Sequence, residues 1–136
     1  MYPEPLVLPM KQELVSTGFE ELLTPDAVDK AIAQKGTVLM VVNSVCGCAA
    51  GAARPGVKAS LQNTKKPEHL TTVFAGFDVE ATARARKHFA PYPPSSPAIA
   101  LFKDGQLVHF VERHNIEGRT AAMIADHLKM VYDEFC

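Results

Sequence analysis

Residues 37–43 form the feature that most limits how this chain can fold. The run Thr-Val-Leu-Met-Val-Val-Asn is β-branched and apolar, and it lies between Gly36 and a short polar turn. An unalternating run of this kind is typical of a central strand that is buried on both faces of a sheet. Together with the alternation of strands and helices along the chain, it indicates an α/β sandwich.

Two helices are expected before this strand. Pro9 favours the start of a short helix over residues 9–17, and Gly18 ends it. Thr24 is a stronger start signal, since a capping hydroxyl precedes Pro25; this second helix stops at Gly36. An additional strand near residues 6–8 is a further expectation.

The elements expected after the strand follow from turn residues, apolar periodicity and helix caps. They are a helix over residues 45–63 with a kink at Pro55, a strand over 70–77, a helix over 78–88 that Asp78 caps, strands over 98–103 and 107–112 joined at Asp104-Gly105, and a helix over 117–135.

This order places a βαβ half before a ββα half, which resembles the thioredoxin-like arrangement. We therefore expect an α/β, thioredoxin-like three-layer sandwich with a central mixed sheet. No repeat or long linker divides the 136 residues. The chain is predicted to be a single domain over residues 1–136, with an amino-terminal extension over about 1–23.

Charge and hydropathy limit the classes of partner and the cellular location that we expect for this chain. The net charge is −1 and the sequence pI is about 6.5, so no general basic field favours nucleic acid or an anionic membrane. No apolar run reaches the roughly 18 residues of a membrane span. The amino terminus lacks the features of a secretory signal, so we expect a cytoplasmic protein. Nothing determines an oligomer, which leaves a monomer or a weak homodimer.

The three cysteines are Cys46, Cys48 and the last residue, Cys136. An odd count in which Gly47 alone separates two of them is no disulfide framework for a secreted protein. In a reducing compartment, a close pair is catalytic or metal-binding more often than structural.

Cys46 follows the predicted buried strand and begins a helix, where free amides and the helix dipole favour a thiolate. No acidic residue lies between Asp29 and Glu68, whereas Arg54 and Lys58 follow the pair. Since the thiolate is the attacking form in thiol–disulfide exchange, we expect Cys46 to be the nucleophile. Its neighbour Cys48 would then resolve the mixed disulfide.

Gly47 allows the tight backbone that a bond between Cys46 and Cys48 needs. Such a bond is strained and easily reduced, so the pair is expected to act on disulfides of other molecules. The alternatives are inert packing and a metal site, but zinc needs about four ligands at recognised spacings. The chain offers one Cys-x-Cys, so we expect no metal. We expect surface or packing roles for the histidines, which are His69, His88, His109, His114 and His127.

Four prolines fall within residues 90–97, and Ser96-Pro97 directly precedes a predicted strand. A cis bond is plausible at this position, where it would leave the Ser96 backbone free to pair with an extended substrate chain. The alternative is a loop that the prolines merely stiffen. Cys136 follows an amphipathic helix at a mobile end, and it is a candidate accessory thiol or an incidental free one.

The segment over residues 42–55, Val-Asn-Ser-Val-Cys-Gly-Cys-Ala-Ala-Gly-Ala-Ala-Arg-Pro, closely resembles the bacilliredoxin family of bacterial thioredoxin-like proteins with a Cys-Gly-Cys motif. The chain departs from ordinary thioredoxins, because it has no Trp and because one residue, instead of two, separates Cys46 from Cys48. The resemblance extends to Pro9-Met10, Gly18-Phe19, Ser95-Ser96-Pro97 and Cys136.

The resemblance implies an enzyme that removes bacillithiol from mixed disulfides with client proteins. Cys46 would be the nucleophile, Cys48 the resolving thiol and Pro97 the loop proline, with Gly47 and Ser96 beside the substrate. No cofactor would be bound, bacillithiol would be the low-molecular-weight thiol co-substrate, and bacillithiolated proteins would be the partners. Two alternatives remain. One is a general protein disulfide reductase or isomerase, and the other is a non-catalytic thiol module that senses redox state or delivers metal.

Overall fold

The computed structural model describes residues 2–136. Its elements, in chain order, are α1 (Glu4–Val15), β1 (Glu20–Glu21), α2 (Pro25–Ile32), β2 (Thr37–Asn43), the π-helical segment η1 (Ala49–Ala53), α3 (Arg54–Ser60), β3 (His69–Phe74), α4 (Val79–His88), β4 (Ala98–Lys103), β5 (Gln106–Val111), α5 (Arg113–Ile116) and α6 (Ala121–Phe135).

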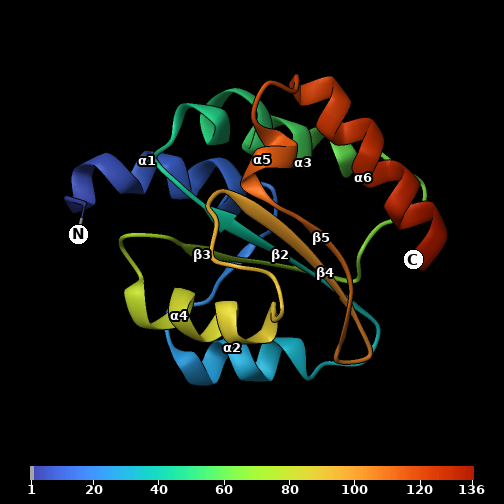
Figure 1. The fold of residues 1–136 in the computed structure, drawn as a ribbon, viewed down its shortest axis with the longest axis horizontal. Coiled ribbons are helices and arrows are strands. Elements are labelled where there is room, and N and C mark those ends of the chain that lie inside the picture. Colours follow the sequence, from blue (N-terminus) through green and yellow to red (C-terminus); the bar gives the residue numbers. More distant parts are fainter. Residues whose placement is uncertain (1) are drawn as a thin grey trace.

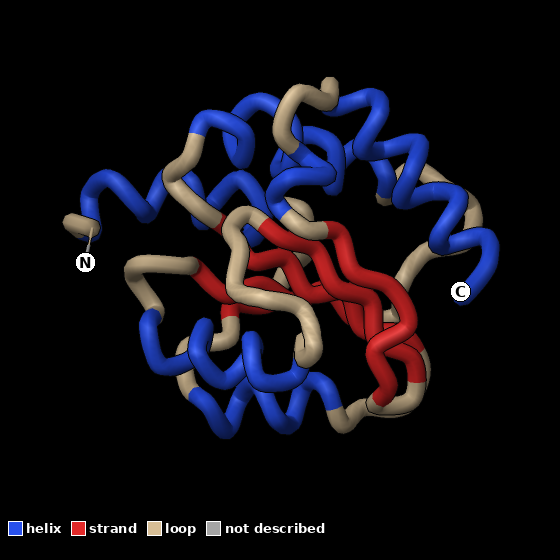
Figure 2. The backbone as a smooth tube through the Cα atoms, in the orientation of Figure 1, coloured by secondary structure: helices blue, strands red, loops and turns tan. Residues whose placement is uncertain are grey.

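The strands form one mixed sheet in the order β1-β3-β2-β4-β5. The central strand β2 is parallel to β3 and antiparallel to β4, and all seven of its residues are buried. Helices α1, α3 and α6 cover one face of the sheet, while α2 and α4 cover the other (Figures 1 and 2). The predicted three-layer α/β sandwich with a central mixed sheet is confirmed.

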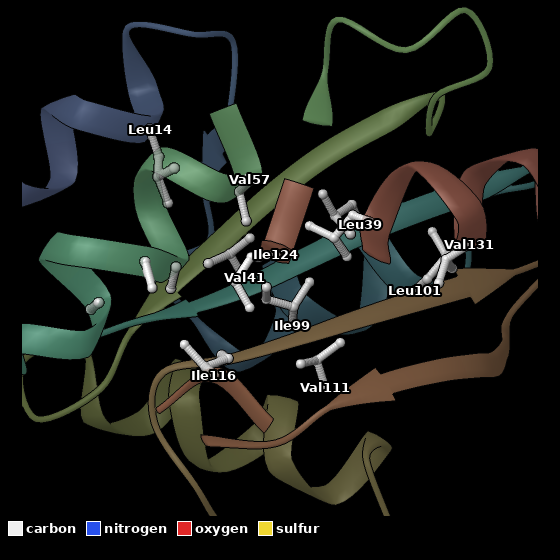
Figure 3. Packing of buried hydrophobic residues seen from close by; sticks show 14 of the residues in the cluster. Leu14, Leu39, Val41, Val57, Ile99, Leu101, Val111, Ile116, Ile124 and Val131 are labelled. Atoms are coloured by element: carbon white, nitrogen blue, oxygen red, sulfur yellow. The ribbon is translucent and has the colours of Figure 1, made fainter. Parts of the chain in front are cut away.

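Two apolar cores lie on the two faces of the sheet, because successive side chains of a strand point in opposite directions. Leu39 and Val41 of β2 belong to the core beneath α1, α3 and α6, whereas Met40 belongs to the core beneath α2 and α4. Figure 3 shows the first core, in which Val57 of α3 and Ile124 of α6 approach the sheet. This packing holds α3, the helix that follows the cysteines, firmly against the sheet.

The amino-terminal elements differ from expectation. Helix α1 begins at Glu4 and carries Pro9 inside it, so both the start at Pro9 and the strand near residues 6–8 are wrong. Val7 and Leu14, two turns apart, are both fully buried, and this burial offsets the hydrogen bond that Pro9 cannot donate. The sheet gains its extra strand at β1, which pairs with β3.

The helix predicted after the cysteines is confirmed with narrower bounds, since helical residues run without a break from residue 47 to residue 60 rather than over 45–63. Within it, Ala49–Ala53 form the π-helical η1, and the α-helical part α3 begins at Arg54. Pro55 lies inside this helical stretch, where it cannot donate a backbone hydrogen bond and its ring crowds the preceding turn. The wider π turn is the local deviation that the proline imposes.

Several other predictions can be compared directly. The Thr24 cap is confirmed, since its hydroxyl accepts the Ala27 N–H at 3.1 Å. The hairpin is confirmed too, with φ of 49° at Asp104 and 82° at Gly105. The last helix begins at Ala121 rather than at residue 117, and α5, a short helix that the sequence did not predict, precedes it across Gly118 (φ 75°).

Two further predictions near β3 and α4 are corrected. Strand β3 ends at Phe74 rather than at residue 77. Asp78 precedes α4 but makes no side-chain cap; its carboxylate instead pairs with the Lys11 ammonium at 2.8 Å. No helix within residues 2–136 combines the length and apolar character needed to cross a membrane.

Candidate active site

Cys46 and Cys48 lie in the short connection between the end of β2 and η1, and both are partly exposed free thiols. Their Sγ atoms are 2.6 Å apart. The Cys48 N–H also points at the Cys46 sulfur, at 3.4 Å. The Cys46 carbonyl accepts the N–H groups of Ala49 and Ala50. The backbone therefore begins to coil at Cys46, as the sequence predicts, and it directs amide donors toward the first sulfur.

The two thiols have opposite electrostatic environments. The pKa of Cys46 is lowered, first by the hydrogen bond from the Cys48 thiol and then by the backbone of Cys48 and Ala49 and by the charge of Arg113, against the opposing effect of burial. The pKa of Cys48 is raised, first by burial and then by its hydrogen bond to Cys46. These opposite shifts favour the thiolate at Cys46 over the thiolate at Cys48.

Arg113 is a site residue that the sequence reasoning missed. Its Nη1 donates to the carbonyl of Ser96 at 3.3 Å, and its backbone N–H donates to the Ser95 hydroxyl at 3.3 Å. Its Nε donates to the Glu117 carboxylate at 2.6 Å. No local pattern could reveal it, because the fold brings α5 to the cysteines from a distant part of the chain. The expected cations were Arg54 and Lys58, which follow the pair in sequence.

Arg54 points inward, away from the sulfurs, and is only 1% exposed. Its Nη1 donates to Asn43 Oδ1 at 2.9 Å and to the Ser44 carbonyl at 2.8 Å, while its Nε faces Glu13 at 3.2 Å. Asn43 in turn donates to the Met10 carbonyl at 3.1 Å. Arg54 therefore positions the loop that carries the cysteines, and its charge is neutralised by Glu13.

Ser44 links this buried network to the nucleophile. Its hydroxyl accepts the Cys46 N–H at 3.1 Å, and its own N–H donates to Asn43 Oδ1 at 2.8 Å. The backbone between the strand and the first cysteine is thus held at both ends by side chains. Asn43 and Ser44 lie within the motif of the sequence resemblance, but their spacing alone gave no reason to assign them this role.

The predicted substrate-binding residues lie as follows. The Ser96–Pro97 bond is cis, as expected, with Pro97 buried and Ser96 half-buried before β4. Gly47 is exposed and its φ lies outside the left-handed region, and a Cβ built there meets no atom within 4 Å. Because both cysteines are free thiols here, the expectation that Gly47 allows the backbone of a Cys46–Cys48 bond stays a prediction. Its missing side chain leaves the space beside the sulfurs open.

Cys136 is not brought to this site. Its thiol lies beside Thr37, at the start of β2, and burial is the main reason that its pKa is raised. Cys46 follows the other end of β2, and seven extended residues span about 20 Å. Figure 1 shows the carboxyl terminus on the side of the sheet opposite to the end of β2. Cys136 and the pair of the same molecule are thus far apart, and an accessory role for Cys136 toward another chain stays a prediction.

His109 of β5 and His127 of α6 form a contact that the sequence reasoning did not predict, with their Nε2 atoms 2.9 Å apart. Burial, and then the charge of His127, lowers the pKa of His109. Within the part of the chain that the structure describes, no three His, Cys, Asp or Glu side chains gather as metal ligands would.

Comparison with known proteins adds to this geometry. A family model described as "Disulphide isomerase" matches residues 2–136. A bacilliredoxin from Cytophaga hutchinsonii is 67% identical over 134 residues, covering 98% of this chain and 99% of the relative. A bacilliredoxin from Koribacter versatilis is 51% identical over 137 residues, covering 100% of this chain and 94% of the relative.

Solved structures show the same fold at low sequence identity. A thioredoxin variant from Halobacterium salinarum has a TM-score of 0.60 at 18% identity, covering 88% of this chain and 91% of the other. Mitochondrial thioredoxin 3 from Saccharomyces cerevisiae has a TM-score of 0.60 at 16% identity, covering 90% and 98%. The fold is thus thioredoxin-like, whereas the high sequence identity is to bacilliredoxins. The protein belongs to the bacilliredoxin family and is a thiol–disulfide oxidoreductase.

Proposed function

We propose that this bacilliredoxin reduces mixed disulfides between bacillithiol and protein thiols, in the cytoplasm. The observation that carries the proposal is the opposed pair of pKa shifts, lowered at Cys46 and raised at Cys48. One sulfur is thereby ready to attack, while the other holds a proton until it is needed. The names of the relatives support bacillithiol as the small thiol.

The exchange proceeds in two displacements. The Cys46 thiolate attacks the bacillithiol sulfur of the mixed disulfide; a new S–S bond forms, the old one breaks, and the client leaves as a thiolate. Cys48 then loses its proton and attacks Cys46, which expels bacillithiol as a thiolate and leaves a Cys46–Cys48 disulfide. A second bacillithiol can instead attack the Cys46 adduct, which yields bacillithiol disulfide and restores the Cys46 thiol. Either route transfers two electrons from thiols to the mixed disulfide.

The rest of the site fits a protein client. Gly47 leaves room beside the sulfurs, and Ser96, next to Pro97, is half-buried at the edge of the site. A backbone segment of the client can pair with Ser96 while its modified cysteine lies against Cys46. Client proteins carrying bacillithiol are therefore the proposed partners, with no resident cofactor.

Mass spectrometry of three proteins tests these roles. Wild type, Cys46→Ser and Cys48→Ser are each incubated with a bacillithiolated client in the absence of free bacillithiol, which would remove the adduct from Cys46. We expect the client to be freed by wild type and by Cys48→Ser, with a bacillithiol adduct on Cys46 accumulating in Cys48→Ser. Cys46→Ser should free none, and full turnover by this variant would exclude Cys46 as the nucleophile.

A second candidate function is the reduction or isomerisation of disulfides within proteins, which the description of the matching family model favours. The same cysteine pair suits both reactions, so the substrate decides between them. Comparing kcat/KM on one bacillithiolated client and on a scrambled disulfide protein separates the two. A clearly higher value on the scrambled protein would favour the isomerase.

A further inference from the structure

We propose that His109, His127 and Met123 form a binding site for a single Cu(I) ion. The site lies between β5 and α6, which neighbour each other in Figure 1, and neither Cys46 nor Cys48 lines it. The proposal therefore goes beyond the proposed function, and the exchange reaction at the cysteines does not need the ion. It assigns a chemical role to two histidines for which the sequence indicates only surface or packing roles.

The first observation is how the fold brings the three residues together. Residues two apart on a strand share a face, so His109 lies on the same face of β5 as Val111, which is buried in the core beneath α6. Residues four apart on a helix are neighbours, so Met123 and His127 lie one above the other on α6. The three residues line one cavity of about 290 Å³ between the strand and the helix. Donors from two distant segments of the chain thus converge on one space.

The second observation is the distance between the two imidazoles. Their Nε2 atoms are 2.9 Å apart and their ring centroids are 5.0 Å apart, so the rings meet at nitrogen rather than face to face. One Nε2 donates a proton and the other accepts it with a lone pair. Metal–nitrogen bonds of about 2.0–2.1 Å place two ligands of one ion about 2.8–3.4 Å apart in right-angled to tetrahedral geometry. After small rotations of the rings, an ion can therefore replace the shared proton, which moves through water to Nδ1 of the donor ring.

The third observation is the chemical nature of the three donors. A thioether is a soft ligand that selects Cu(I), whereas zinc is bound by thiolates, imidazoles and carboxylates. Two neutral imidazoles and a thioether bring no negative charge, and Arg119 lines the same cavity, so a monovalent ion is opposed less than a divalent one. Met123 is 49% exposed and His127 is exposed too. The ion can therefore enter from solvent, and core packing does not explain either residue.

Competition with a chromophoric Cu(I) chelator tests the proposal. The parent protein is the full chain with Cys46→Ser, Cys48→Ser and Cys136→Ser, because free thiolates would bind the same soft ion. Under anaerobic conditions with ascorbate, we expect the parent to take one Cu(I) per chain from the chelator. Cu(I) has a filled d shell and is diamagnetic, so NMR can follow the methyl signal of Met123, which should shift as the ion is added.

Variants of the parent identify the ligands. His109→Gln and His127→Gln should each lower the affinity for Cu(I) by at least about tenfold, the smallest loss expected even for a residue that only supports a metal ligand. Met123→Leu should lower the affinity for Cu(I) but leave any affinity for Zn²⁺ unchanged, because it removes the thioether alone. The matched controls are His114→Gln on α5 and Met130→Leu on α6, since neither residue lines the cavity. Both controls should bind Cu(I) like the parent.

Thermal unfolding separates the loss of a ligand from the loss of the fold. Cu(I) should raise the Tm of the parent and of the two controls, because it binds the folded chain, and should raise the Tm of the three ligand variants less. Unchanged affinity for Cu(I) in His109→Gln or His127→Gln would overturn the site. Tighter binding of Zn²⁺ than of Cu(I) by the parent would overturn the choice of metal. Equal losses in Met130→Leu and Met123→Leu would overturn Met123 as the third ligand.

Discussion

Arg54 and Asn43 are joined beneath the cysteine loop, where Nη1 of the arginine donates to Oδ1 of the asparagine at 2.9 Å. Both side chains belong to residues that are 1% exposed, so this hydrogen bond lies in the interior. It connects the end of β2 to the start of α3 across the segment that carries Cys46 and Cys48. The geometry of the reactive pair thus depends on a buried charge that never touches a sulfur.

Arg54→Met should therefore destabilise the fold and misplace the loop. It leaves the Ser44 carbonyl without this donor and removes one of the two donors to Asn43 Oδ1, and we expect a loss of about 2–4 kcal/mol in the free energy of unfolding. Urea titrations measure it. The control is Glu13→Gln, which alters the exposed partner and should cost less than about 1 kcal/mol. Equal losses for the two variants would contradict the central role of Arg54.

Gly56 of α3 lies directly against α6. A Cβ built on Gly56 lies 2.7 Å from the Cβ of Ile124 and 3.0 Å from the Ala121 carbonyl, so neither neighbour can yield by a side-chain rotation alone. Gly56→Ala should lower the free energy of unfolding by about 1–3 kcal/mol. Gly51→Ala is the matched control, because a Cβ there meets nothing within 4 Å. Thermal unfolding that left Gly56→Ala as stable as Gly51→Ala would refute the close contact.

Tyr132 makes stability fall at high pH. Burial raises its pKa to about 12, so the folded protein keeps the phenol neutral while an unfolded chain ionises near pH 10. The unfolded state then binds fewer protons, and stability is lost as the pH rises from about 10 to about 12, by about 2–3 kcal/mol in all.

Tyr132→Phe tests this directly, because it removes the titrating hydroxyl. Ser60 keeps its hydrogen bond to the Val57 carbonyl at 2.6 Å, so the variant should lose only about 1 kcal/mol at neutral pH. Denaturant titrations at pH 8 and pH 11 compare the two proteins, and contributions from other groups cancel in the difference. A parallel decline of both proteins with pH would contradict the assignment.

The sequence predicted the parts of the fold and site that depend on local pattern. Residues 37–43 read as a buried strand, and the hairpin at Asp104 read as a turn, because strand periodicity and turn chemistry are local. The helix start predicted at Pro9 is wrong, because the burial of apolar residues along α1 outweighs the one hydrogen bond that Pro9 cannot donate. The place of Cys46 at a helix start predicts that it is the nucleophile, and its lowered pKa agrees with that prediction.

The remaining site residues come from long-range packing. Arg113 reaches the Ser96 carbonyl, from where its charge acts on Cys46, only once β5 and α5 lie beside the loop before β4. Arg54 looked like a cation near the thiols, but its direction depends on Asn43 and Glu13, which no spacing rule relates to it. Tertiary contacts of this kind carry no periodic signal in one sequence.

The proton shared between Cys46 and Cys48 gives the last prediction. Because the Cys48 thiol is the main cause of the lowered pKa of Cys46, Cys48→Ala should raise that pKa, whereas Cys48→Ser keeps a hydroxyl donor and should raise it less. Alkylation of Cys46 by iodoacetamide follows the thiolate, so its rate should increase at lower pH in Cys48→Ser than in Cys48→Ala. Both variants also carry Cys136→Ser, so that the distant Cys136 thiol does not contribute to the measured alkylation. Identical pH profiles for the two variants would mean that backbone amides and Arg113 alone stabilise the nucleophile.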